Sequence, residues 1–405
     1  MHQNQPRPLW AGRTLALIGI VLVAFNLRTA VASLSPIIVQ LERDVPLSPV
    51  VVGLLGMLPP LCFAVFGIVT PAIAKRAGLE IALIGSLAAL AVGLAGRGFA
   101  GDALWLVAAS ALTFAALGVG NVLLPPLVKR YFPDRIGLVT TLYVTAMSVS
   151  SFMPPLIAVP VADAAGWRVS LGLWAVVAAA ALLPWLALLV HPRRQAADVL
   201  LEGVAPGLLR FALRSPLAWA VTILFMVSGF NAYALFAWLP SILGDIAGTS
   251  PAESGALLSL FAAMGLPAGL VVPIIAARHG RVRLLVGIAS VTLVVGYAGL
   301  IIAPTFATWL WVAIVGIGPL LFPLSLVLIN LRTRTHEGSV ALSGFVQSVG
   351  YLMVAVGPLA VGLLHDATGG WLWPLLFLLG SAVPAAIAGL VASRPRYLED
   401  EFAEA

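Results

Sequence analysis

The chain has 405 residues, of which 61% are hydrophobic and only 9% charged, whereas soluble globular proteins carry about 25% charged residues. Its 22 Lys and Arg and 16 Asp and Glu residues are too few to give a chain of this length a polar surface. This composition excludes an ordinary soluble enzyme and indicates that the lipid bilayer is the main partner. The basic residues are scattered in twos and threes, so we expect no nucleic acid partner.

Apolar runs separated by short polar or Gly/Pro segments predict twelve transmembrane helices. In chain order the runs cover 14–37, 50–74, 79–96, 103–128, 137–161, 168–190, 216–242, 253–276, 283–302, 306–330, 339–363 and 371–393. A helix needs about 20 apolar residues to cross a bilayer, so these runs use most of the chain. We therefore predict an all-α membrane protein with no sizeable extramembrane domain.

Basic residues predict the orientation, because cytoplasmic loops retain Lys and Arg. With the N-terminus inside, eighteen of the 22 fall in inner segments, while Arg43, Arg97 and Arg168 fall outside and Arg28 lies within a span. This distribution predicts that both termini lie on the cytoplasmic side of a bacterial-type cytoplasmic membrane. An alternative is that the first run is a secretory signal with a cleavage site at Ala30-Val31-Ala32, which would leave eleven spans.

The two halves of the chain resemble each other at an offset of 202 residues. Residues 71–78 and 273–280 are identical at five of eight positions, and Ser48-Pro49 corresponds to Ser250-Pro251. Six spans followed by six in the same orientation form a parallel repeat, in which two bundles face each other across a central cavity. We expect the domains to be a first bundle at 1–190, a cytoplasmic linker at 191–215 and a second bundle at 216–405.

This arrangement resembles the major facilitator superfamily. The loop between its second and third spans usually carries an acidic residue, which the segment from Gly67 to Gly78 lacks, so the usual charge latch of the inner gate is not implied here. Further motifs are Asn26–Ala30, Tyr131–Gly137, Tyr233–Pro240, Leu331–Thr335, Gln347–Tyr351 and Gly357–Leu359. Through these motifs the chain is similar, within the superfamily, to the branch of cyanate permeases and nitroimidazole transporters.

The resemblance implies a secondary active or facilitative transporter that works by alternating access. It implies a small polar anion such as cyanate as substrate, with neutral aromatic compounds such as 2-nitroimidazoles as the alternative, in uptake or efflux. No nucleotide-binding Gly-rich motif is present. An integral membrane enzyme would need a buried acid, base or metal set, and none is visible, so we predict no catalytic residue, no metal and no cofactor. We also expect a monomeric protein.

Arg28 is the strongest candidate for a substrate ligand, because we expect it to be the only charged residue well inside a span. It lies about 21 Å along the first helix, counted from Thr14. A charge at this depth costs at least a few kcal/mol unless it faces a wet cavity or finds partners, and the planar guanidinium suits small planar or linear anions. The alternative is a structural role in which Arg28 binds backbone carbonyls of a neighbouring helix.

Proton coupling by the protein itself is not expected, because Asp, Glu and His fall at span ends or in loops. The cavity should be positive when empty, and a coupled proton would travel on the substrate. Otherwise the protein would be a uniporter or exchanger.

Eight further side chains inside spans are candidates for substrate binding. They are Asn26, Asn121, Tyr143, Asn231, Tyr233, Trp238, Gln347 and Tyr351. The alternative for the polar ones is hydrogen bonding between helices, and Trp238 is equally consistent with a pocket wall or a membrane-interface anchor. Trp167 and Trp371, at outer ends, are expected to belong to an aromatic belt.

Overall fold

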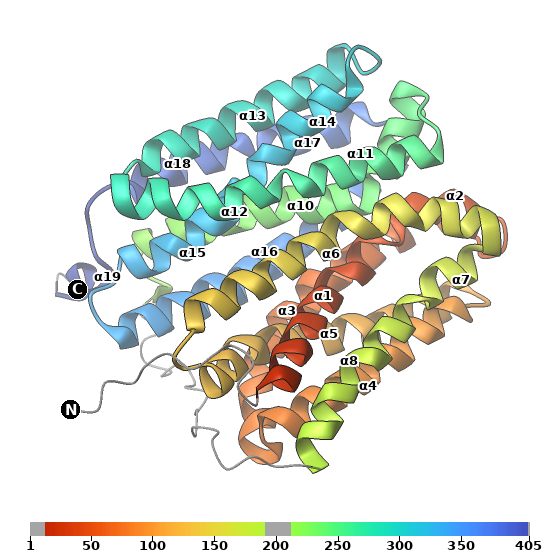
Figure 1. Ribbon diagram of the computed structural model, residues 1–405. Coiled ribbons are helices and arrows are strands. Elements are labelled where there is room, and N and C mark those ends of the chain that lie inside the picture. The colour runs from red at the N-terminus through yellow and green to blue at the C-terminus, as the bar shows by residue number, and fades with distance from the viewer. Residues whose placement is uncertain (1–12, 191–211, 404–405) are drawn as a thin grey trace.

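A computed structural model describes residues 13–190 and 212–403, and these form helices joined by short turns (Figure 1). Twelve helical segments in this part of the chain are long and apolar enough to cross a membrane. The predicted count and order of the spans are therefore confirmed. The predicted linker lies mostly outside the described residues, in 191–211.

The first six spans form one bundle. They are α1 (Thr14–Ala32) continued by η1 (Ser35–Ile37) and α2 (Ile38–Leu41), α3 (Pro49–Ala77), α4 (Leu79–Gly98), α5 (Ala103–Tyr131), α6 (Ile136–Ala165), and α7 (Trp167–Gly172) continued by α8 (Trp174–Val190). Figure 1 shows α1 beside α5 and α6, while α4 and α8 cover the outside of this bundle.

The second six spans form the other bundle. They are α10 (Pro216–Ala247), α11 (Pro251–Ala263) with α12 (Gly265–Pro273) and the π-helix η2 (Ile274–Arg278), α13 (Val282–Ile302), α14 (Thr308–Ile317) with η3 (Gly318–Leu320) and α15 (Leu321–Leu331), α16 (His336–Thr368), and α17 (Leu372–Gly380) with α18 (Ala382–Ala392). A short helix, α19 (Leu398–Ala403), follows the last span.

Helix starts reproduce the internal repeat in atomic detail. The Ser48 hydroxyl accepts the backbone N–H of Val51 at the start of α3, and the Ser250 hydroxyl accepts that of Glu253 at the start of α11. In each case the next residue is a proline, whose missing N–H and fixed φ suit the first position of a helix. The repeated Ser-Pro pair therefore begins the equivalent helix in both halves.

We call the end of the molecule that carries these Ser-Pro caps the far end. A hydrogen bond between a tryptophan and an aspartate joins spans there in each half. Trp167 donates to Asp44 over 2.9 Å, and Trp371 donates to Asp245 over 2.7 Å. Both tryptophans are buried, at 6% and 5% exposure, so the expected aromatic-belt role is wrong for them. Hydrogen bonds from Trp167 and Arg168 also lower the pKa of Asp44 below its ordinary value.

The bundles pack tightly against each other towards the far end. A Cβ atom added at Gly56 would lie 2.8 Å from Pro358, and one added at Gly255 would lie 2.7 Å from the carbonyl oxygen of Pro155. Glycine is thus required where α3 meets α16 and where α11 meets α6, because no side chain fits between these helices. The far end is closed by this close approach.

Three side chains donate hydrogen bonds across the two bundles within residues 13–190 and 212–403. The donors are Arg28, near the middle of its span, Ser35, which reaches the carbonyl of Phe236 over 2.6 Å, and Ser259, which reaches the carbonyl of Phe152. Ser35 and Ser259 belong to the segments nearest the far end. The polar contacts between bundles therefore reinforce the same closure that the glycines allow.

We predict that Gly255→Ala opens the far end, because its methyl group would meet a backbone oxygen that cannot move aside. Spin labels on Arg43→Cys and Ala252→Cys, both exposed positions on opposite bundles, would report the opening by pulsed electron spin resonance in a Cys62→Ala background. The distance distribution should shift to longer values. Gly269→Ala is the matched control on the same span, since nothing lies within 4 Å of its added Cβ. Identical distributions in both variants would contradict the closure described here.

Candidate functional site

Arg28 joins the two bundles at the centre of the molecule. It projects from α1, is half-buried, and its Nη1 donates to the hydroxyl of Tyr233 on α10 over 2.6 Å. The guanidinium also interacts with the hydroxyl of Tyr351 on α16, and its central carbon lies 5.7 Å from the ring centre of Phe63 on α3. A charge from the first half therefore meets two phenols from the second half.

Aromatic rings surround this charge. Tyr351 packs edge-on against Phe63, with ring centres 5.6 Å apart, and against Phe225, with ring centres 4.9 Å apart. Phe225 in turn contacts Phe322 at 5.3 Å. We call Phe63, Phe225, Tyr233, Phe322 and Tyr351 the aromatic group.

Sequence reasoning did not identify the three phenylalanines, because a Phe in an apolar span is indistinguishable from a core residue. One indirect signal is Gly350, where an added Cβ would lie 2.6 Å from the Phe225 ring. This glycine is needed for Phe225 to reach Tyr351.

No carboxylate neutralises Arg28 within the described residues. The five ion pairs found there are Arg13–Asp134, Arg130–Glu80, Arg135–Asp134, Arg168–Asp44 and Arg334–Asp400, all at helix ends or in loops. A guanidinium has five N–H donors and keeps its proton, and phenol oxygens use only part of this capacity. The site therefore carries a positive charge with donors left for a ligand.

Asn26 and Asn231 take the structural role that the sequence left open. Asn26 donates to the carbonyl of Val177, at 3.5 Å, and so connects α1 to α8. Asn231 donates to the hydroxyl of Ser381 over 2.9 Å and accepts from Tyr297 over 2.7 Å, which connects α10 to α18 and α13. Both amides are 1% exposed. Each one joins the first span of its own bundle to the last span of that bundle, and we leave both out of the proposed substrate contacts.

Trp238 belongs to the far-end closure. Its Nε1 donates to the carbonyl of Pro358 over 2.8 Å, its ring packs on Trp371 at 5.6 Å, and it is 4% exposed. It follows Tyr233 by five residues, which is about 7.5 Å along a helix. Trp238 also lines a far-end cavity of about 280 Å³, so its role as a pocket wall stays a prediction.

Gln347, Asn121 and Tyr143 are half-buried and stay candidates. Gln347 lies one turn before Tyr351 on α16 and donates to Ser343 over 2.8 Å, so its carbonyl oxygen is available. Asn121 and Tyr143 make no side-chain hydrogen bond with any residue that the structure describes. Asn121 follows Gly120, whose added Cβ would lie 3.4 Å from Leu27, the residue next to Arg28. The turn of α5 that carries Asn121 therefore packs against α1 beside Arg28.

Arg97 corrects the expectation that Arg28 is the only charge inside the protein. Sequence reasoning placed it on the outer side, but it lies in the last turn of α4 with 0% exposure. Its Nη1 donates to the carbonyl of Ala30 over 3.0 Å, and its guanidinium lies 5.7 Å from the ring centre of Phe114. Helical side chains point back toward the N-terminus of their helix, which carries this guanidinium into the bundle.

Comparison with known proteins identifies the family. A family model described as Major Facilitator Superfamily matches residues 17–341. The chain is 33% identical to the uncharacterized transporter YycB of Bacillus subtilis, over 98% of this chain and 96% of that protein. It is 31% identical to the 2-nitroimidazole transporter of Escherichia coli, covering 95% and 96%, and 27% identical to the cyanate transport protein CynX of the same organism, covering 89% and 92%.

A solved structure of a bacterial homolog of the human lysosomal transporter Spinster, in an inward-facing, unoccupied conformation, superposes with a TM-score of 0.78. Its sequence is 16% identical, and the match covers 97% of this chain and 99% of that chain. This similarity supports the fold.

We predict that Asn231→Ala destabilises the protein without changing its affinity for ligand. The substitution leaves the buried hydroxyl of Tyr297 without its acceptor, which costs about 1–3 kcal/mol. Thermal unfolding of the purified protein should show a lower midpoint, whereas ligand dissociation constants below that midpoint should stay within about twofold. A loss of affinity at unchanged stability would instead place Asn231 in the binding site.

Proposed function

The chain belongs to the Major Facilitator Superfamily, whose members are membrane transporters rather than enzymes, and we propose that this secondary transporter carries a small planar anion bound at Arg28. Cyanate, a linear anion of three heavy atoms, is the example that we propose. The observation that carries the proposal is a guanidinium deep between the two bundles with no carboxylate beside it in the described residues. An arginine this deep in a membrane protein is costly unless it has a partner, and an anionic substrate supplies one.

The chemistry around Arg28 supports a planar anion. The guanidinium is a planar fork of donors that matches two acceptor atoms at once. The phenol hydroxyls of Tyr233 and Tyr351 can each donate to the same anion. The surrounding rings are apolar and lower the local dielectric constant, which strengthens the attraction between the charges.

Position also supports transport. Arg28 belongs to the first bundle, whereas Tyr233 and Tyr351 belong to the second, so an anion held by all three pulls on both bundles. A transporter that opens alternately to each side needs a site that both bundles share. The substrate then stays near the middle of the membrane while the bundles rock around it.

We propose that both termini lie on the cytoplasmic side of a bacterial cytoplasmic membrane. The distribution of Lys and Arg supports this orientation, and the relatives YycB and CynX come from bacteria. The far end would then face outward, and the state described here would be closed to the outside. We further propose that the protein acts as a monomer with domains at 1–190 and 216–405.

Proton coupling would not use an Asp, Glu or His side chain at the site. Within residues 13–190 and 212–403, the groups found in contact with Arg28 are the phenols of Tyr233 and Tyr351 and the ring of Phe63. A proton would therefore move on the substrate as a weak acid, or transport would be uniport or exchange.

A neutral nitroaromatic is the second candidate substrate, and the aromatic group is the observation that favours it. Three phenylalanine rings and two phenols offer stacking surfaces, and nitro oxygens can accept from Arg28. The relative named as a 2-nitroimidazole transporter supports this alternative. The two candidates differ in how strongly binding depends on the charge of Arg28.

We predict that cyanate stabilises the wild-type protein and that Arg28→Gln strongly reduces this stabilisation. A ligand at 100 times its dissociation constant stabilises the native state by about 2.7 kcal/mol, and loss of the charged partner should weaken binding by about 2–5 kcal/mol. Thermal shift of purified protein with cyanate and 2-nitroimidazole measures both candidates. Arg168→Gln, an exposed arginine of the far end, is the matched control. Stabilisation by 2-nitroimidazole alone, retained in Arg28→Gln, would contradict anion transport.

We predict that Tyr351→Phe weakens anion binding about five- to tenfold, since it removes one hydrogen bond worth about 1 kcal/mol and keeps the ring contacts with Phe63 and Phe225. Affinity for 2-nitroimidazole should change less than twofold. Competition binding at fixed temperature gives both constants. Equal weakening for the two ligands would show that the hydroxyl does not distinguish charge.

A further inference from the structure

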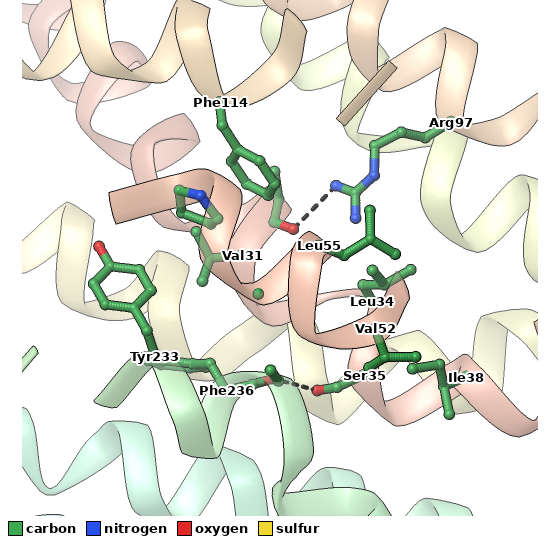
Figure 2. A pocket seen from close by; sticks show the side chains of 14 residues that line it. Val31, Leu34, Ser35, Ile38, Val52, Leu55, Arg97, Phe114, Tyr233 and Phe236 are labelled. Carbon is green, nitrogen blue, oxygen red and sulfur yellow. Dashed lines mark hydrogen bonds between the residues drawn. The ribbon is translucent and has the colours of Figure 1, made fainter. Parts of the chain in front are cut away.

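Arg97 lines a small cavity between the Arg28 site and the far end. The cavity has a volume of about 30 Å³ and is walled mainly by apolar side chains of α1, α3 and α10, among them Val31, Leu34, Leu55 and Phe236. Figure 2 shows the guanidinium of Arg97 turned towards this space, with one dashed bond to the carbonyl of Ala30. It is the one charged side chain among the lining residues.

The guanidinium of Arg97 has donors without acceptors. Its side chain is completely buried, and Nη1 is satisfied by Ala30, but Nε and Nη2 have no hydrogen-bond partner among the residues that the structure describes. Desolvating a charge is expensive unless it is paired. One backbone carbonyl and the ring of Phe114 supply no negative charge, so the buried donors of Arg97 have the chemistry of an anion-binding site.

The cavity and the Arg28 site share one residue. Tyr233 lines the cavity and also accepts the hydrogen bond from Arg28. Ala30 and Val31, on the cavity wall, follow Arg28 by two and three residues, or roughly 3–5 Å along the helix. Tyr233 therefore belongs both to the Arg28 site and to the wall of the cavity that Arg97 lines.

We propose that Arg97 binds a small monoanion and is a second station for the substrate anion, on the far-end side of Arg28. This proposal rests on the proposed function. A site of about 10–15 Å³ suffices for one water, so the cavity admits an anion of two or three heavy atoms, such as cyanate, and is too small for an aromatic ring in this state. When the far end opens and Tyr233 moves, an anion passes from one guanidinium to the other.

A second station answers a problem that a single deep charge creates. An anion held only by Arg28 would leave slowly, because nothing outside that site offsets the loss of its guanidinium. Arg97, a second positive group on the far-end side, lowers that barrier to release, as multiple weak sites do in ion pathways. The order of contact would be Arg97 first for an anion that enters from the far end, and Arg97 last for one that leaves there.

The test is the number of anions bound. Equilibrium dialysis of ¹⁴C-cyanate against purified full-length protein in chloride-free buffer should give two sites in the wild type and one in Arg97→Gln. Arg28→Gln should lose the other site, and Arg168→Gln should keep both. Arg97→Lys, which keeps the charge and loses the fork of donors, should retain the second site with about tenfold weaker affinity. Thermal midpoints of each variant confirm that the protein is folded.

The alternatives give different results. A single cyanate site that Arg28→Gln removes and Arg97→Gln keeps would overturn the second station and leave the proposed function standing. Binding of ³⁶Cl⁻ that depends on Arg97, with no cyanate at either arginine, would contradict the proposed function and the transfer between arginines together, and would make the cavity a site for a resident inorganic ion.

Discussion

The structure depends on a positive charge that is held inside the membrane part of the protein without a negative partner. Arg28 reaches from the first bundle to Tyr233 of the second over 2.6 Å, and phenols can stabilise a guanidinium only in part. This incomplete pairing is what makes the site a binding site. A carboxylate in the same place would satisfy the arginine and leave nothing for an anion.

The remaining architecture keeps this charge at the boundary between two similar bundles. Buried amides fix the first span of each bundle to its last, through Asn26 with Val177 and Asn231 with Ser381. Tryptophan and aspartate pairs fasten the far-end turns in both halves. These bonds lie within each bundle, whereas the contacts between bundles rely on small residues such as Gly255. Each bundle can thus move as a unit while the interface between them changes.

Much of the fold was predictable because lipid imposes simple rules on sequence. Apolar runs long enough to cross a bilayer and a repeated Ser-Pro helix start at Ser48 and Ser250 gave the spans and their relation. Arg28 could also be singled out from the sequence, since a charge in an apolar run must face a wet cavity or find partners. Tyr233 and Tyr351, inferred only as polar residues in spans, do meet Arg28 in the structure.

Other features depend on side-chain direction, which sequence spacing alone does not reveal. Arg97 closes an apolar run and therefore resembles a loop residue, although its long side chain turns back into the bundle. Trp238 and Asn231 lie on the same helix as Tyr233 and face different neighbours, so being on the right span did not place them in the site. The phenylalanines of the aromatic group were hidden among the many apolar residues that face lipid or core.

The most direct test of the central claim is the charge carried during transport. Purified protein in liposomes on a solid-supported membrane should give a transient current when cyanate is added, because the anion displaces negative charge as it enters the site, and the size of the current should saturate with concentration. The account predicts that Arg28→Gln abolishes this current while Arg168→Gln retains it. A wild-type protein that gives no current with cyanate but accumulates 2-nitroimidazole, with or without Arg28, would contradict the account.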